Sequence, residues 1–336
     1  MKMKVLITDY VAPPAVFEER VLSDMADVVC LQETNEAALR GKVEAADGLI
    51  VFHKIVLTSR SIDWMTRCKV IVRCGVGFEN VDLAVAGSKG IYVCNVPDYG
   101  VDEVADHAIA LMLFCSRGLS FTEKRLRKTL KPWNHHATPK LYRLAGGIFG
   151  VIGLGRIGTA TAMRAKSLRM KVVACDPYIP DGRDKAVDVT MMPLDDLMAV
   201  SDVVSVHTPL TEETRGIVGA AQLAKMKSHA ILINTARGEC VDVDALAEAL
   251  KTEKIGGAGL DVLPTEPPET DRAIIKLWQQ DDPPVNLVLT PHSAFYSEQG
   301  EEEMHTKAAL EVRRVLLGEK PRNMVNEEYL VGGVTH

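Results

Sequence analysis

The chain lacks a long apolar segment and an excess of basic residues. None of its apolar runs approaches the ~20 residues that a membrane-spanning helix needs, and its start, Met1–Val5, leads directly into a strand pattern without a cleavable signal. The formal net charge is −6 and the pI is near 5.9. Such a charge argues against nucleic acid or an anionic membrane as the main partner, so we expect neither.

The chain also lacks paired cysteine motifs. Its seven cysteines, at positions 30, 68, 74, 94, 115, 175 and 240, are an odd and scattered set without a Cys-x-x-Cys pair. The adjacent His135 and His136 have no further ligands at metal spacing. Reduced thiols of this kind are typical of a cytosol. We therefore expect a cytoplasmic protein without a bound metal.

The first hundred residues alternate short apolar strands with segments of helical length. Strands are expected at Lys4–Thr8, Asp27–Leu31, Gly48–Phe52 and Val70–Arg73, and Glu36–Ala46 is one of the helical-length segments between them. Apolar strands separated by helices pair in parallel and are covered on both faces. The pattern predicts an α/β fold and a small flavodoxin-like domain.

The remaining chain repeats this pattern more regularly. A long apolar helix over Ala108–Leu119 and a polar connection over residues 121–145 precede a series of strands, at Ile148–Ile152, Lys171–Cys175, Val203–His207, Ala230–Asn234, Gly257–Leu263 and Leu287–Pro291. This series predicts a Rossmann-type, doubly wound parallel sheet. The helical segment Glu302–Leu317 has no later strand to pair with and is expected to fold back on the first domain. We expect a discontinuous first domain, residues 1–102 and 297–336, and a second domain, residues 103–296.

A glycine-rich turn carries the clearest functional signal. Gly153-Leu154-Gly155-Arg156-Ile157-Gly158 follows an apolar strand, and Asp176 follows the next strand. In a dinucleotide site the three glycines permit the tight turn, the approach of the pyrophosphate and the packing of helix on strand. The pyrophosphate would lie on amides at a helix N-terminus. Asp176 would bond the adenosine ribose and repel a 2′-phosphate, so we expect NAD rather than NADP.

Three side chains with catalytic chemistry stand just past three successive strand ends: Arg237, Glu266 and His292. Each also has a purely structural interpretation. Arg237 could form a surface ion pair, Glu266 could be an exposed acid of a loop, and His292 could be a structural histidine whose hydrogen bonds are made within the fold. Their joint placement favours one site, because ligands of open α/β sheets bind at the carboxyl ends of strands. His207 also ends a strand, but the adjoining Thr208-Pro209 indicates the adenosine side.

The trio suits hydride transfer between a nicotinamide and a small 2-hydroxy or 2-oxo acid. His292 would give or take the proton of the substrate oxygen, and Glu266 on the far ring nitrogen would fix its tautomer. Arg237 offers a planar fork for the substrate carboxylate. The nicotinamide performs the redox step, while the protein orients the substrate and protonates its oxygen.

Four motifs resemble those of the D-isomer-specific 2-hydroxyacid dehydrogenases, and the resemblance runs over nearly the whole chain: Gly75–Asp82, Val151–Gly158, Asn234–Asp242 and Thr290–Ala294. The resemblance implies that Arg237, Glu266 and His292 form the catalytic set. It also implies that amides near Val76 and Gly77 hold the substrate carboxylate opposite Arg237, on one wall of an interdomain cleft. Family members are usually homodimers joined through the nucleotide domain, here by the helix from Val104 and its long connection.

The residues expected to bind ligands lie in these motifs and after other strands of the second domain. For the substrate they are Val76, Gly77, Arg237 and His292. For NAD they lie at the strand ends of the second domain: Ile152, Gly153, Leu154, Gly155, Arg156, Ile157, Gly158, Asp176, Pro177, His207, Thr208, Pro209, Thr214, Thr235, Ala236, Arg237, Asp261, His292 and Ala294.

Within the family, Asp176–Tyr178, Val93–Pro97 and Ala294–Gln299 look most like the C-terminal-binding-protein branch. Animal members of that branch are NAD-sensitive transcriptional corepressors and carry Trp where this chain has Phe295. One alternative is therefore an NAD(H)-sensing, corepressor-like binding protein with vestigial catalysis. The complete trio favours an enzyme, for example a glyoxylate or hydroxypyruvate reductase. A formate dehydrogenase is disfavoured, because that relative pairs its histidine with Gln rather than with a residue like Glu266.

Overall fold

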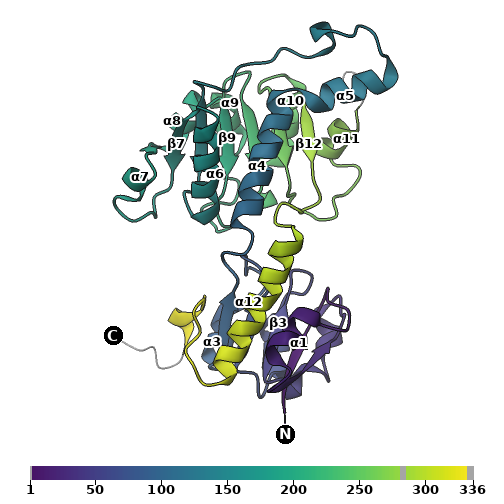
Figure 1. Cartoon of the computed structure of the whole chain (residues 1–336), viewed down its shortest axis with the longest axis vertical. Coiled ribbons are helices and arrows are strands. Elements are labelled where there is room, and N and C mark those ends of the chain that lie inside the picture. The colour runs from purple at the N-terminus through teal and green to yellow at the C-terminus, as the bar shows by residue number, and fades with distance from the viewer. Residues whose placement is uncertain (1, 281–284, 331–336) are drawn as a thin grey trace. The chain divides into compact units, whose positions relative to one another are not determined.

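The computed structural model describes residues 2–280 and 285–330. The chain divides into two compact units (Figure 1). The first unit comprises residues 1–100 and 297–336, and the second unit comprises residues 101–296. All the paired strands of both units run parallel. The predicted α/β class is thereby confirmed.

A seven-stranded sheet forms the centre of the second unit in the described residues, in the order β12-β11-β10-β9-β6-β7-β8. Its strands are β6 Ile148–Ile152, β7 Lys171–Cys175, β8 Thr190–Met191, β9 Val203–Val206, β10 Ile231–Asn234, β11 Gly257–Leu260 and β12 Leu287–Leu289. The order of the chain reverses where β6 and β9 adjoin. This point is the topological switch at which doubly wound sheets bind ligands.

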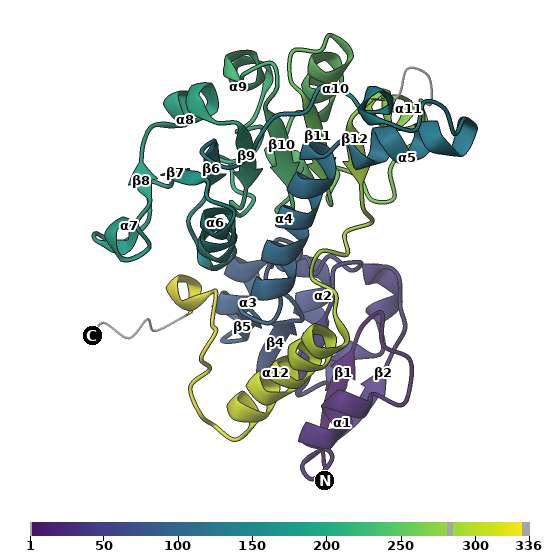
Figure 2. The same ribbon diagram turned by 45° about the horizontal axis from the view of Figure 1, so that its top comes forward.

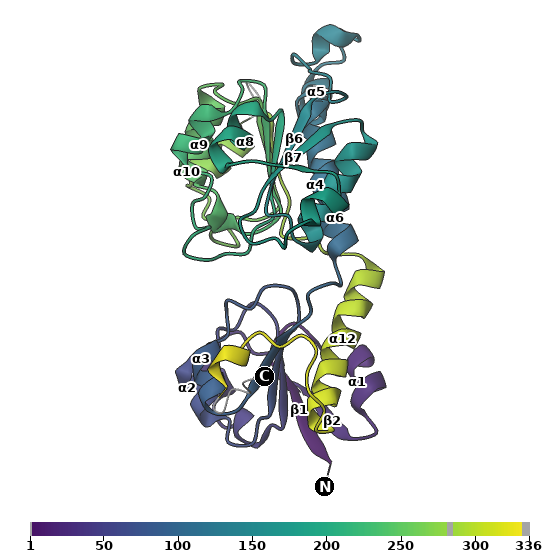
Figure 3. The same cartoon turned by 90° about the vertical axis from the view of Figure 1, so that its left-hand side faces the viewer.

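Helices cover both faces of this sheet, as Figure 3 shows. One face carries α4 (Val101–Ser116) and α6 (Arg156–Ser167), and the other carries α8 (Leu194–Val200), α9 (Ala220–Lys225) and α10 (Val243–Lys251). Successive strand residues point to opposite faces. Val151 accordingly packs in the core with α4 and α6, whereas Ile152 packs in the core with α10.

The first unit contains a five-stranded sheet in the order β2-β1-β3-β4-β5. Its strands are β1 Met3–Ile7, β2 Ala26–Cys30, β3 Gly48–Val51, β4 Val70–Arg73 and β5 Tyr92–Asn95. Helices α1 (Val16–Leu22) and α12 (Glu298–Leu316) lie on one face, and α2 (Ser59–Trp64) and α3 (Leu83–Ser88) lie on the other. Figure 2 shows α12 beside α1, so the C-terminal helix belongs to the first unit.

The segment Glu36–Ala46 has the length of a helix, but it forms no α-helix. It folds into two short 3₁₀ turns, η1 (Glu36–Leu39) and η2 (Val43–Ala45). Gly41 lies between them with φ +81°, a left-handed conformation that interrupts a right-handed helix. Here the local backbone overrides the segment length on which the expectation rested.

Two further elements differ from the expectations. Helix α5 (Leu119–Lys128) occupies the start of the expected polar connection. Strand β5 was not among the expected strands and forms one edge of the first sheet. In the described ranges no single helix is long and apolar enough to cross a membrane, and α4 and α5 pass that test only as a bent pair.

One buried amide side chain ties the C-terminal segment to β5. Asn326 is fully buried; its Oδ1 accepts a hydrogen bond from Val93 N–H at 2.9 Å, and its Nδ2 donates to Ile91 O at 3.0 Å. Val325 N–H donates to Val93 O at 2.9 Å. These bonds satisfy backbone groups that an edge strand would otherwise leave unpaired.

We expect Asn326→Ala to destabilise the first unit by about 1–3 kcal/mol, because it leaves the buried Val93 N–H and Ile91 C=O without partners. Hydrogen exchange at the Val93 amide measures this loss as faster exchange. The control is Lys320→Ala, which removes an exposed ion pair with Glu327 and should cost less than about 1 kcal/mol. Unchanged protection of Val93 in the Asn326 variant would contradict the assignment.

Candidate active site

The register of three neighbouring strands brings three loops to one edge of the second sheet. Asn234 at the end of β10 pairs with Leu260 of β11, and Leu260 pairs with Leu289 of β12. The three strands therefore end level, and the loops that follow them leave from the same edge. These loops carry Arg237, Glu266 and His292, respectively.

Glu266 and His292 form a direct contact. Nδ1 of His292 lies 2.6 Å from Oε2 of Glu266, and the two side chains are 38% and 33% exposed. The other carboxylate oxygen, Oε1, accepts a hydrogen bond from Leu263 N–H at 2.8 Å. Glu266 is thus held by its own loop while it orients the imidazole. The ring nitrogen that does not contact Glu266 is Nε2.

His292 lies in a strained turn that Asp261 holds in place. Its φ is +53°, in the left-handed region that non-glycine residues seldom adopt. The backbone oxygen of Asp261 accepts from His292 N–H at 2.8 Å. The carboxylate of Asp261 accepts from Ser293 N–H at 3.0 Å and from Ala294 N–H at 2.9 Å. Asp261, which was expected to bind NAD, therefore first serves to build the His292 turn.

Arg237 is placed by the turn that ends β10. The buried Asn234 donates from Nδ2 to Arg237 O at 2.8 Å and accepts at Oδ1 from Ala236 N–H at 3.0 Å. Nη1 of Arg237 donates to Ala236 O at 2.7 Å. A Cβ atom on Gly238 would lie 2.0 Å from the carbonyl carbon of Leu263. Only glycine allows this approach, which packs the Arg237 turn against the loop that leads to Glu266.

The glycine-rich turn after β6 has the close packing expected of a pyrophosphate cradle. Gly153 has φ +91°, and a Cβ on it would lie 2.8 Å from His207 O. A Cβ on Gly158 would lie 2.0 Å from Gly153 O. Helix α6 begins at Arg156, directly after this turn. Its first amides have no acceptor within the helix, which suits an anion at its N-terminus.

Asp176 faces this turn from the end of β7. Its Oδ2 accepts from Leu154 N–H at 2.8 Å, and its Oδ1 accepts from Tyr178 N–H at 2.9 Å. Both bonds fix the carboxylate beside the glycine turn. The fold therefore brings together two segments that a whole helix and strand separate in the sequence.

The loop after β9 is shaped by its own hydrogen bonds. Thr214 donates from Oγ1 to Pro209 O at 2.6 Å and accepts from Thr211 N–H at 2.8 Å. Nε2 of His207 lies 2.8 Å from Ser205 Oγ. Burial lowers the pKa of His207 to about 4, so the ring is neutral at pH 7. A neutral ring is better suited to the expected position beside an adenosine than to a role in proton transfer.

The hydroxyl of Thr235 at this edge is buried and makes no hydrogen bond to the described residues. Thr235 lies directly after β10. Leaving a buried hydroxyl unpaired is costly. The orphaned hydroxyl, the glycine cradle and the Asp176 carboxylate together fit a dinucleotide along the carboxyl edge of the second sheet.

Val76 and Gly77, the other expected substrate residues, follow β4 in the first unit. Val76 O accepts from Asn95 Nδ2 at 2.7 Å. Asn80 Nδ2 donates to Phe52 O, also at 2.7 Å, and so ties this turn to the loop after β3. The turn is therefore well held within its own unit, and its part in binding substrate stays a prediction.

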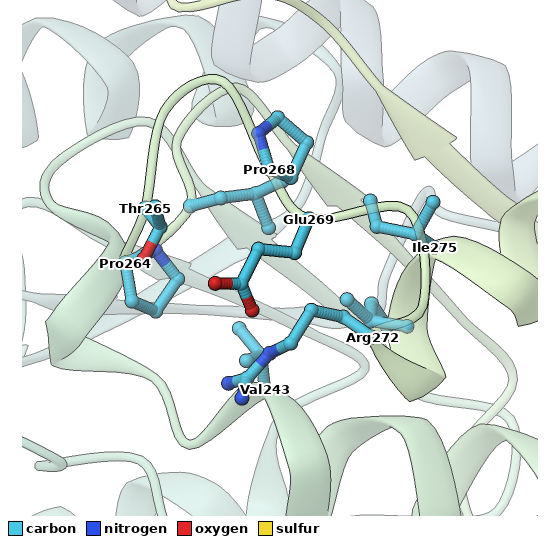
Figure 4. Close-up of a pocket in the computed structure, with 9 residues that line it drawn as sticks. Val243, Pro264, Thr265, Pro268, Glu269, Arg272 and Ile275 are labelled. Carbon is cyan, nitrogen blue, oxygen red and sulfur yellow. The ribbon is translucent and has the colours of Figure 1, made fainter.

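A small pocket also borders the loop after β11. It is lined by Val243, Leu263, Pro264, Thr265, Pro268, Glu269, Arg272, Ile274 and Ile275, and the side chains of Glu269 and Arg272 project into it (Figure 4). None of the trio lines this pocket, so it is distinct from the candidate site. Within the described residues no group of three or more His, Cys, Asp or Glu could hold a metal.

Two residues outside the predicted set also support the site. Thr290 and His107 contact one another at 2.9 Å beside the His292 turn. A lone histidine within an apolar helix was the available signal for His107. Its partner lies 183 residues away in the sequence, so no local pattern indicates the contact.

Residues 109–294 match the family model described as D-isomer specific 2-hydroxyacid dehydrogenase, NAD binding domain. The chain belongs to this family. It is 35% identical over 325 residues to D-3-phosphoglycerate dehydrogenase of Methanocaldococcus jannaschii, covering 96% of this chain and 59% of the relative. The chain thus spans about three fifths of the length of the curated relatives that it matches.

Two solved structures share the fold of this family member. D-lactate dehydrogenase of Aquifex aeolicus, complexed with NAD and lactic acid, has a TM-score of 0.84 and 30% identity, covering 96% of this chain and 100% of that one. The NADPH-dependent glyoxylate/hydroxypyruvate reductase of Sinorhizobium meliloti, with NADP and malonate, has a TM-score of 0.82 and 28% identity, covering 97% of each chain. The predicted family and Rossmann-type domain are confirmed.

We expect Asp176→Asn to raise the ratio of kcat/KM for NADPH to that for NADH by about tenfold, because it removes a charge that repels a 2′-phosphate. Asn keeps an acceptor for Leu154 N–H and loses only the hydrogen bond from Tyr178 N–H, so the glycine turn should persist. Kinetics with both coenzymes measure the ratio, and Asp184→Asn, which neutralises an acid on the neighbouring helix α7 (Arg183–Ala186), is the control. An unchanged ratio would show that Asp176 does not select the coenzyme.

Proposed function

We propose that the chain is an NAD-dependent 2-hydroxyacid dehydrogenase, which transfers hydride between a nicotinamide and a small 2-hydroxy or 2-oxo acid. The observation that carries this proposal is the contact between His292 and Glu266, on the strand edge that also presents Arg237. Membership of the family supports the reaction class.

The residues of this chain divide the work of the reaction. The bound nicotinamide supplies or accepts the hydride. Glu266 holds Nδ1 of His292, so Nε2 is the atom that gives a proton to the carbonyl oxygen in reduction and takes it back in oxidation. Arg237 binds the substrate carboxylate through its planar guanidinium and polarises the neighbouring carbonyl. Placing these groups lowers the entropic part of the barrier.

The substrate class follows from this division. The relatives are named for 3-phosphoglycerate, lactate, and glyoxylate or hydroxypyruvate. Each of these compounds has a carboxylate beside the carbon that is oxidised or reduced, which is the arrangement that Arg237 and His292 suit. We propose a short 2-oxo acid of the glyoxylate or hydroxypyruvate type, with Val76 and Gly77 amides also contacting its carboxylate.

NAD is the proposed coenzyme because Asp176 stands beside the glycine turn. A carboxylate at this place accepts ribose hydroxyls and repels a 2′-phosphate. The corepressor-like alternative gains no support from the compared proteins, whose names are those of dehydrogenases and reductases. The family's C-terminal-binding-protein branch stays a prediction from motif likeness alone.

A homodimer is proposed from exposed apolar side chains on the connection that follows α5. Leu130 is 68% exposed and Trp133 is 76% exposed. Large aromatic side chains in such positions are typical of protein interfaces. We propose that this connection, together with α4 and α5, contacts a second copy of the chain.

For the activity, we expect wild-type protein to oxidise NADH with at least one short 2-oxo acid, and His292→Ala to lower kcat about 10²–10⁴-fold through loss of the proton donor. Arg237→Lys should mainly raise KM for the acid, because an ammonium cannot form the two-point contact. Steady-state rates over a panel of 2-oxo acids measure both effects.

The control for these variants is NADH binding, followed by fluorescence, which should change little in both. Tight NADH binding by the wild-type chain without turnover of any acid would overturn the dehydrogenase proposal and leave a coenzyme-binding protein. Equal kcat in His292→Ala and wild type would remove His292 from the reaction.

For the dimer, we expect the double variant Leu130→Ser/Trp133→Ser to weaken self-association by about 30-fold or more, the effect of losing an interface anchor worth about 2 kcal/mol. Sedimentation velocity over a range of concentrations measures it. Leu317→Ser, which changes a 56% exposed leucine on the first unit, is the matched control. A monomeric wild type would end the proposal.

A further inference from the structure

A histidine outside the predicted set lies against the His292 turn. His107 is on α4, and its side chain is 24% exposed. Its Nε2 lies 2.9 Å from Thr290 Oγ1 and 3.6 Å from Oδ1 of Asp261. The contact joins a helix on one face of the second sheet to the loop after β12, within a single unit.

The hydrogen bonds of His107, Thr290 and Asp261 all run in one direction. Thr290 Oγ1 lies 2.5 Å from Oδ1 of Asp261 and donates its one hydrogen there, since a carboxylate only accepts. The same hydroxyl oxygen must then accept from His107, so Nε2 of His107 carries a hydrogen. A chain of donors therefore runs from His107 through Thr290 to Asp261.

Asp261 is the residue on which the His292 turn depends. Its side chain is 1% exposed. Besides Thr290, its carboxylate accepts the N–H groups of Ser293 and Ala294, and its backbone oxygen accepts the N–H of His292 itself. A rotation of this carboxylate would alter the two amides that follow His292. The left-handed φ of +53° makes that residue sensitive to such a change.

We propose that His107 is a positioning residue for His292, acting through Thr290 and Asp261. By donating to Thr290, His107 fixes the hydroxyl rotor that in turn holds one oxygen of the Asp261 carboxylate. The carboxylate orientation then sets the turn that aims the His292 imidazole. This inference rests on the proposed function, because it assigns His107 a part in the reaction that His292 performs.

The effect should fall on kcat. A histidine that only packed α4 against the sheet would affect thermal stability and leave the rate of the folded enzyme unchanged. A positioning residue changes the rate once substrate is bound, because even a small misplacement of a reacting group slows the chemical step. KM for the acid and the Kd for NADH should then change little.

The test is steady-state kinetics at saturating NADH, at one pH, with the best 2-oxo acid of the panel. We expect His107→Ala to lower kcat about tenfold and to change KM and the NADH Kd less than about threefold. His107→Gln should restore most of kcat, because its amide N–H can reach Thr290. Thr290→Val should lower kcat as much as His107→Ala does, whereas Thr290→Ser should retain the wild-type kcat. The two Thr290 variants test the same hydrogen bond if His107→Ala fails to fold.

Two controls separate positioning from general disturbance. The double variant His107→Ala/Thr290→Val should be no slower than either single variant, as expected of residues in one chain of contacts. Asp106→Ala, on the same helix as His107, removes an ion pair with Arg164 of α6 and should leave kcat within twofold. The inference would be overturned if the kcat losses of the two single variants multiplied in the double variant, or if Asp106→Ala lowered kcat as much as His107→Ala.

The outcomes also distinguish the inference from the proposed function. No turnover by wild type with any acid would overturn both. Turnover by wild type, lost in His292→Ala but unchanged in His107→Ala and Thr290→Val, would overturn the inference alone. A loss of kcat in His107→Ala that Gln does not restore would also count against the proposed hydrogen bond.

Discussion

The candidate site depends on the parallel register of β10, β11 and β12. Parallel strands that end level release their loops at one edge, and Glu266 and His292, which are far apart in the chain, meet there. The buried Asn234 and the close approach at Gly238 then lock two of these loops together. A shift of one residue between β10 and β11 would break this close approach of Gly238 to Leu263.

Polar groups rather than apolar packing determine the fine geometry of this edge. A backbone amide of its own loop donates a hydrogen bond to Glu266, and the carboxylate of Asp261 accepts hydrogen bonds from the two amides after His292. Hydrogen bonds to a carboxylate are directional and comparatively strong. They can hold His292 in a left-handed turn that an apolar core could not specify, and they leave its imidazole half exposed for chemistry.

The nucleotide-binding end of the same sheet is built differently. At the topological switch, Gly153 and Gly158 permit backbone contacts that a Cβ would block. The carboxylate of Asp176 closes the turn from the neighbouring strand. Close backbone packing and one carboxylate thus define this end, while the side chains of Arg237, Glu266 and His292 define the other. The first unit has a separate five-stranded sheet and includes the C-terminal helix α12.

The amino-acid sequence predicts the alternation of strands and helices, the glycine turn with Asp176 and the trio past three strand ends. These signals are local, because apolar periodicity and short spacings specify them. The break of Glu36–Ala46 at Gly41, the hydrogen bonds of Asn326 at the edge of β5 and the contact of His107 with Thr290 across 183 residues become visible in the three-dimensional structure alone. Such contacts depend on how whole elements pack, because a side chain's partner is set by the position of its helix or strand and not by its neighbours in the chain.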